Sequence, residues 1–114
     1  MKQSEFRIMA MGMPEVKESS HHGHPDFRVG EKIFATLGCP DKMWGMVKVT
    51  RELQEILVES YPDVFVRVRG GWGFRGSTNV LLRRARRSIL RKALAKAWHR
   101  AAPKNLKRQI DVRE

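Results

Sequence analysis

The chain has 114 residues, a formal net charge of +11 and a single cysteine, so it can form at most one domain with a modest core. One cysteine cannot make an internal disulfide, which argues against a disulfide-stabilised secreted module and favours the cytoplasm. No apolar stretch approaches the ~20 residues of a membrane span, and the start lacks the pattern of a signal peptide. A content of 41% hydrophobic and 31% charged residues indicates a folded chain.

The charge is distributed unevenly along the chain. Residues 1–60 contain 8 basic and 9 acidic side chains, a net charge of −1, whereas residues 61–114 contain 15 basic and 3 acidic ones, a net charge of +12. The 47 residues between Asp63 and Asp111 include 14 Lys or Arg and no carboxylate side chain. The second half is therefore where a partner of opposite charge is expected to bind.

The first half predicts a short helix followed by strands. Ser4 can cap a helix over residues 4–13, which Gly12 and Pro14 end. From residue 15 the apolar period changes to two, and residues 30–31 form a tight turn between two such runs. We expect three strands joined by short turns, a loop over residues 38–42, and a fourth strand over residues 43–49. The apolar strand positions are Val16, Phe27, Val29, Ile33, Ala35 and Leu37.

The second half predicts a helix, two strands and a last helix. Thr50 is of a residue type that caps helices, so we expect it to begin a helix, which ends at Pro62. The next strand alternates three valines with Phe65, Arg67 and Arg69, and a glycine-rich segment separates it from a strand over residues 78–82. The apolar face of the Thr50 helix comprises Leu53, Ile56, Leu57 and Ser60, and that of the last helix Ile89, Leu90, Ala93, Leu94, Ala97, Trp98 and Ala101.

These elements predict an α+β fold with two layers. The order is α-β(3-4)-α-β(2)-α, and the short connections between strands imply an antiparallel sheet. Helices on one face leave the other face of the sheet open to solvent or to a partner. We expect one domain over residues 1–103 and a basic tail over residues 104–114.

A glycine-rich segment over residues 71–76 formally matches the dinucleotide fingerprint G-x-G-x-x-G. It joins two strands here, and Lys96 stands where the fingerprint needs an acid, so we reject that interpretation. A flexible loop carrying Trp72, Phe74 and Arg75 could instead lie against a nucleic acid. Alternatively, the two aromatic side chains fold back onto the core.

The sequence shows no convincing catalytic or metal-binding group. In a regular strand His22, His24 and Asp26 would share one face and His21 the other, but Gly23 and Pro25 disrupt such a strand. No base or orienting group accompanies the serines or Cys39. We therefore expect no enzyme activity, no metal and no cofactor.

The basic residues of the second half form the most informative pattern. Four arginines stand at the start of the last helix, where the helix dipole disfavours cations, so stability alone would not select them. If the valines of the preceding strand face the helices, Arg67 and Arg69 face outward on the open side, and Lys48, Asn79 and Arg83 join them. The predicted binding residues are Arg67, Arg69, Trp72, Arg75, Arg83, Arg84, Arg86, Arg87, Lys92, Lys96 and Arg100.

A polyanion complements such a surface. Lys and Arg displace the counterions of phosphates, and six to eight contacts predict a log–log salt dependence with a slope of about −5 to −7. Double-stranded DNA is the partner that we expect. An acidic protein docked by a chaperone-like module, or a solvated basic face without a partner, would use the same charges, whereas the last helix lacks the extra apolar surface that membrane insertion requires.

Several segments resemble the bacterial MmcQ/YjbR family in their order and spacing. The resemblance covers residues 13–20, 22–29 and 30–37, then Gly71-Trp72-Gly73 with Thr78, and finally Ala97-Trp98 and residues 102–104. It implies an α+β domain like that of secretion chaperones, similar also to the double-wing DNA-binding module of a phage transcription activator, and no set of catalytic residues. His22, where an aromatic residue is more usual, and the dense arginine run over residues 83–87 depart from the family pattern.

Overall fold

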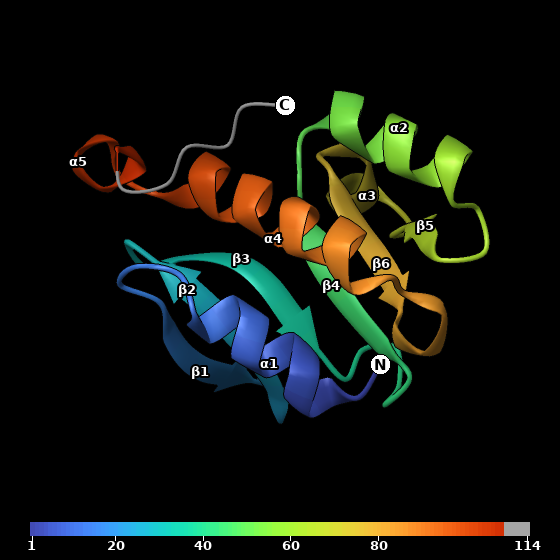
Figure 1. Ribbon diagram of the computed structural model, residues 1–114, viewed down its shortest axis with the longest axis horizontal. Helices are drawn as coiled ribbons and strands as arrows, with labels where there is room; N and C mark the ends of the chain where they lie inside the picture. Colours follow the sequence, from blue (N-terminus) through green and yellow to red (C-terminus); the bar gives the residue numbers. More distant parts are fainter. Residues whose placement is uncertain (109–114) are drawn as a thin grey trace.

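The computed structural model describes residues 1–108. One sheet is partly covered by helices (Figure 1). In chain order the elements are α1 (Gln3–Met11), β1 (Lys17–His21), β2 (His24–Val29), β3 (Lys32–Leu37), β4 (Trp44–Lys48), α2 (Arg51–Ser60), β5 (Phe65–Arg67), α3 (Gly71–Phe74), β6 (Ser77–Leu81), the 3₁₀ turn η1 (Leu82–Arg84), α4 (Arg87–Ala101) and α5 (Lys104–Lys107).

The six strands form one antiparallel sheet in the order β1-β2-β3-β4-β6-β5. The predicted α+β class and the four strands before α2 are confirmed. Gly30 and Glu31 have φ values of 55° and 68°, as the predicted two-residue turn between β2 and β3 requires. The predicted tail starts with α5, and residues 109–114 lie outside the described residues.

Helices α1 and α4 cover one face of this sheet (Figure 1). A Cβ atom on Gly45 of β4 would lie 2.8 Å from the Phe6 ring of α1, so Gly45 and, by alternation, Val47 face the helices. Lys48, the next residue, therefore points to the opposite face. The predicted face of α4 is confirmed, because Leu90, Ala93, Leu94, Ala97 and Trp98 are all buried.

The caps and faces of the first two helices differ in part from the prediction. Lys2, not Ser4, is the N-cap residue of α1. Thr50 caps α2 as predicted, since its Oγ1 accepts a hydrogen bond from the Leu53 backbone N–H at 3.2 Å. Ile56 was expected on the apolar face of α2 but is 58% exposed, while Gln54 is buried. The reason is that Gln54 serves as a hydrogen-bond donor inside the protein, as described below.

The expected orientation of β5 is wrong. Phe65 pairs with Val80 and is buried, whereas Val66 is 44% exposed. The valines therefore do not define the covered face, and Arg67 shares its face with Phe65 rather than pointing away from it. Since both sets of alternating residues begin with an apolar side chain, pairing with β6 decides which set is covered.

The expected flexible loop between the last two strands is in fact mostly helical, because α3 occupies Gly71–Phe74. The strands on either side, β5 and β6, are antiparallel neighbours as predicted. Within residues 1–108 no helix has the length and apolar character needed to cross a membrane.

Candidate nucleic-acid interface

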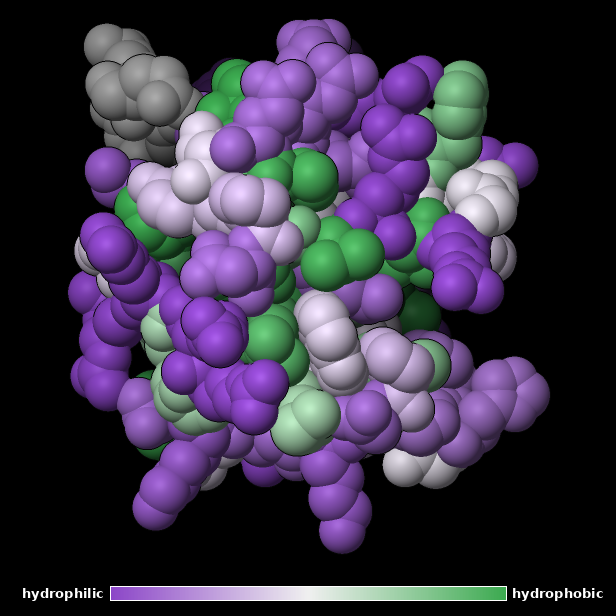
Figure 2. Space-filling model, turned by 90° about the vertical axis from the view of Figure 1, so that its right-hand side faces the viewer, coloured by the Kyte–Doolittle hydropathy of each residue, from purple (hydrophilic) through white to green (hydrophobic). Residues whose placement is uncertain are grey.

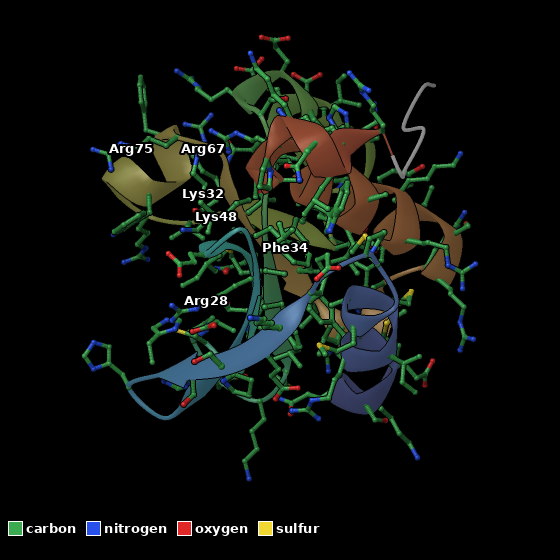
Figure 3. All side chains as sticks on the ribbon, turned by 90° about the vertical axis from the view of Figure 1, so that its left-hand side faces the viewer. Arg28, Lys32, Phe34, Lys48, Arg67 and Arg75 are labelled. Atoms are coloured by element: carbon green, nitrogen blue, oxygen red, sulfur yellow. The ribbon has the colours of Figure 1, made fainter. Side chains whose placement is uncertain are left out.

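A groove of about 460 Å³ lies at one end of the sheet. Strands β2 and β4 end there, and β3 and β6 begin there, because neighbouring strands run in opposite directions. We call it the basic groove, because five cations line it together with Trp72 and one acid, Glu31: the cations are Arg28, Lys32, Lys48, Arg75 and Arg100. Figure 3 shows Arg28, Lys32, Lys48 and Arg75 on the side of the sheet away from α1.

Lys48 is the most enclosed of these cations. Burial lowers the pKa of its ammonium group, and the nearby Arg100 lowers it further, while Asp26 acts in the opposite direction. The Lys48 Nζ lies 5.0 Å from the centroid of the Trp72 ring. A partly desolvated ammonium surrounded by other cations is stabilised when an anion binds beside it.

The segment that carries Trp72 and Arg75 is held close to the sheet. A Cβ atom on Gly73 would lie 1.5 Å from the Val68 carbonyl oxygen, and one on Gly76 would lie 1.8 Å from that of Val49. Gly76 also has a φ of +111°, which side chains other than glycine rarely adopt. Only glycine allows the backbone to approach this closely, and the segment is therefore fixed rather than flexible.

Gln54 provides a second attachment for this segment. Its buried amide nitrogen lies within hydrogen-bond distance of three acceptors, the Gly73 carbonyl at 2.9 Å, the Ser77 carbonyl at 3.1 Å and the Thr78 hydroxyl at 3.1 Å, which share its two N–H donors. All three partners are acceptors, which accounts for a buried amide on α2 where an apolar residue was expected.

The two aromatic side chains of α3 project outward. Trp72 is 61% exposed and Phe74 is 59% exposed, so neither folds back onto the core. Arg75 lies 5.7 Å from the Trp72 ring centroid, and Arg51 lies 4.1 Å from that of Phe74. Both distances are in the range of cation–π contacts.

Arg100 brings the end of α4 to the groove. Its guanidinium donates to the Val49 carbonyl at 2.6 Å and to the Arg75 carbonyl at 3.0 Å. Arg67 adds a further cation at this end of the sheet, since it pairs with Thr78 near the start of β6 and its Cγ lies 2.8 Å from where a Cβ on Gly73 would be. Three predicted residues, Arg67, Arg75 and Arg100, therefore lie at the same end of the sheet as predicted Trp72.

Arg28 is partly neutralised by a buried carboxylate. It donates to both Asp26 oxygens, at 2.8 and 3.1 Å, and His21 Nδ1 lies 2.8 Å from Asp26 Oδ2. The hydrogen bonds from Arg28 lower the pKa of Asp26, His21 adds to this effect, and burial opposes it. The strand face that His22, His24 and Asp26 would share in a regular strand does not form, because His22 and Gly23 lie in a turn. Within residues 1–108 no three His, Cys, Asp or Glu side chains are placed to hold a metal ion.

The predicted arginines at the start of α4 lie elsewhere. Arg87 and Arg100 are 13 positions apart in α4, which places them about 20 Å apart along the helix. At the far end Arg84 pairs with Asp63 at 3.5 Å, and Arg87 pairs with Glu5. Figure 2 views the molecule from the side of α2 and β5, where hydrophilic side chains separate small apolar areas.

The structure thus divides the predicted surface into two basic regions rather than one. Lys92 and Lys96 lie along α4 between these regions, and Arg69 is exposed beyond β5. Lys48 and Asn79 share the open face as expected, since Met46 pairs with Asn79, but Arg83 lies in η1 beyond that strand. Arg28 and Lys32 were missed, because they belong to the near-neutral half of the sequence. The sequence feature that could have identified them as site residues is their position at strand ends beside the turn at residues 30–31.

The chain is similar to known proteins over most of its length. A model of the YjbR family matches residues 11–100. The crystal structure of the Deinococcus radiodurans protein DR2400, a DUF419 domain, matches with a TM-score of 0.76 and 15% identity, covering 95% of this chain and 86% of that chain. At this identity the likeness shows the fold alone. No curated protein matches. Because the family model spans well over half of the chain, the protein belongs to the YjbR family, as its sequence motifs predicted.

Proposed function

We propose that the protein binds nucleic acid, with duplex DNA as the ligand, through the basic groove and without catalysing a reaction. The observation that carries the proposal is a group of cations without carboxylate partners. Within residues 1–108 the salt bridges involve other basic residues, and they leave Lys32, Lys48, Arg67 and Arg75 unpaired with any acid. The groove is lined by five cations and by a single carboxylate, that of Glu31, which forms no salt bridge within residues 1–108. Such an excess of cations in one groove favours a polyanionic ligand.

The dimensions of the basic region suit a phosphate backbone. Arg28 on β2 and Lys48 on β4, which both line the groove, are separated by two strand spacings in the sheet order, which corresponds to about 10 Å. One strand of B-DNA places a phosphate about every 3.4 Å along the helix axis. Several phosphates of one strand can therefore face the row of cations that crosses the end of the sheet.

The structure reduces the expected number of phosphate contacts. The four unpaired cations can each contact a phosphate, while Arg28 and Arg100 already donate hydrogen bonds within the protein. Four to six contacts correspond to a log–log salt slope of about −3.6 to −5.4. This slope is shallower than the one predicted from the sequence, because the arginines at the far end of α4 lie outside the basic groove and are not counted among its phosphate contacts.

Fluorescence anisotropy of a labelled duplex, titrated at several salt concentrations, tests the proposal. We expect binding at low salt with the slope given above. Absence of binding at low salt would refute it. If a protein partner is instead recovered from nuclease-treated lysate, and duplex DNA does not compete with it, the groove serves an acidic protein.

A further inference from the structure

Trp72 is exposed to solvent, unlike a tryptophan of the core. Trp98, in α4, provides the contrast: it is fully buried, and its indole N–H donates to the Pro14 carbonyl at 2.9 Å. Trp72 keeps 61% of its surface exposed although its segment is fixed by close backbone packing. An exposed aromatic ring on a backbone segment that packs closely against the sheet is available for stacking with a ligand, and its side chain has only two rotatable bonds to order.

The surroundings of Trp72 combine apolar walls with cations. Ile33, Ala97 and Ala101 line the groove together with Trp72, the five cations named above and the single acid Glu31. A volume of about 460 Å³ lies within the range of small-molecule sites, which is roughly 300–1,000 Å³. This lining matches a ligand that has both a flat ring and a phosphate group.

A nucleotide has this chemistry, but paired bases in a duplex do not expose their faces. A base must be unpaired, at an end, in a single strand or flipped out of the helix, before it can stack on a side chain. The cations within reach of the ring are Lys48, at 5.0 Å from its centroid, and Arg75, at 5.7 Å. They are placed to contact the phosphate attached to a base that lies against the ring.

We infer that the basic groove accommodates one unpaired nucleotide of a bound strand, with its base on Trp72 and its phosphate beside Lys48 and Arg75. This inference rests on the proposed function, because the rest of the strand is held by the same basic region. A free nucleoside monophosphate shares the ring and the phosphate, so the experiment must separate the two sources.

The test compares three labelled duplexes of the same sequence in one buffer. The first is blunt, the second has a three-nucleotide overhang, and the third has an overhang of equal length made of abasic nucleotides. The last two carry the same number of phosphates, so their difference reports the bases alone. Base stacking on an aromatic side chain predicts binding of the normal overhang about 5- to 140-fold tighter than binding of the abasic one.

Two protein variants complete the test. Trp72→Ala is expected to abolish the difference in affinity between the normal and the abasic overhang, which is measured within the same variant and is therefore independent of any change in its affinity for the blunt duplex. Phe74→Ala is the matched control, because Phe74 is on the same helix and 59% exposed but does not line the groove. Thermal unfolding followed by circular dichroism verifies that both variants are folded.

The outcomes separate this inference from the proposed function. Equal affinity of the wild-type protein for the normal and abasic overhangs would overturn the inference, as would an equal loss of the affinity difference in Trp72→Ala and Phe74→Ala. Binding of the blunt duplex by the wild-type protein would still uphold the proposed function. Failure of every duplex to bind would overturn both. Displacement of the overhang duplex by a nucleoside 5′-monophosphate at concentrations similar to that of the duplex would assign the groove to a free nucleotide and overturn the assignment to a strand.

Discussion

Replacing three cations of the basic groove should weaken DNA binding far more than replacing three cations elsewhere. The groove variant carries Lys32→Gln, Lys48→Gln and Arg75→Gln. The control variant carries Arg83→Gln, Arg86→Gln and Arg91→Gln, three cations near the start of α4 that have no acidic partner within residues 1–108. Each variant lowers the net charge by three, so long-range attraction to DNA changes equally in both.

The magnitude follows from the contacts that the groove offers. Each phosphate contact contributes about 0.9 to the log–log salt slope, which corresponds to about 8-fold in affinity at 0.1 M salt relative to 1 M. Loss of three contacts therefore predicts an affinity about 500-fold lower at 0.1 M salt and a slope shallower by about 2.7. The control variant should keep the wild-type slope, because along α4 Arg91 lies about 14 Å and Arg86 about 21 Å from Arg100, and none of its arginines lines the groove.

Anisotropy titrations of a labelled duplex at four or more salt concentrations provide both quantities. Lys32 and Arg75 are exposed and Lys48 is half-buried, so the groove variant is expected to fold, and thermal unfolding verifies this. An equal loss of affinity and slope in the two variants would refute the reasoning. Binding would then depend on the net charge of the protein rather than on the groove.

Three further predictions concern stability. Gly76→Ala should destabilise the protein by about 2–4 kcal/mol in urea unfolding, because of its φ of +111° and the contact of a Cβ with backbone, whereas Gly71→Ala, where a Cβ meets nothing within 4 Å, should change stability by less than about 0.5 kcal/mol. Asp26→Asn should cost about 1–2 kcal/mol at pH 7, because the folded pKa of Asp26 is lowered by Arg28 and its charge therefore stabilises the fold above the usual value of 3.8; this deficit should shrink as the pH falls through the lower folded pKa, and a constant deficit would contradict the assignment. The folded pKa of Lys48 is lowered by burial, so wild-type stability should rise with pH as the pH passes that pKa toward the usual 10.5, and Lys48→Met should remove this rise in urea unfolding measured at a series of alkaline pH values. A rise that persists in Lys48→Met would show that another group is responsible.

Local sequence signals predicted most of the elements. The apolar period of α4, the Thr50 cap and the turn at residues 30–31 each depend on neighbours within a few residues, and all three are confirmed. The order of strands and helices followed from these signals. The family resemblance rested on motifs spread along the chain, and the family model confirms it.

The errors occurred where distant neighbours decide burial. In β5 both alternating sets contain apolar residues, and only pairing of Phe65 with Val80 shows which set is covered. In α2 the polar Gln54 displaces Ile56 from the covered side, because carbonyl groups of the α3 segment need a donor there. Neither partner lies near its counterpart in the sequence, so local patterns could not reveal them.

By itself the sequence determined the excess of cations in the second half, the element types and the family. Only the tertiary structure decided which cations act together. The antiparallel sheet places Arg28 and Lys32, from the near-neutral half, at the same end as Arg75, and Arg100 reaches it from α4. The length of α4 carries the arginines at residues 83–87 to the opposite end, where two of them pair with acids. Charge composition is a property of the chain, but a binding surface depends on where strand and helix ends meet in space.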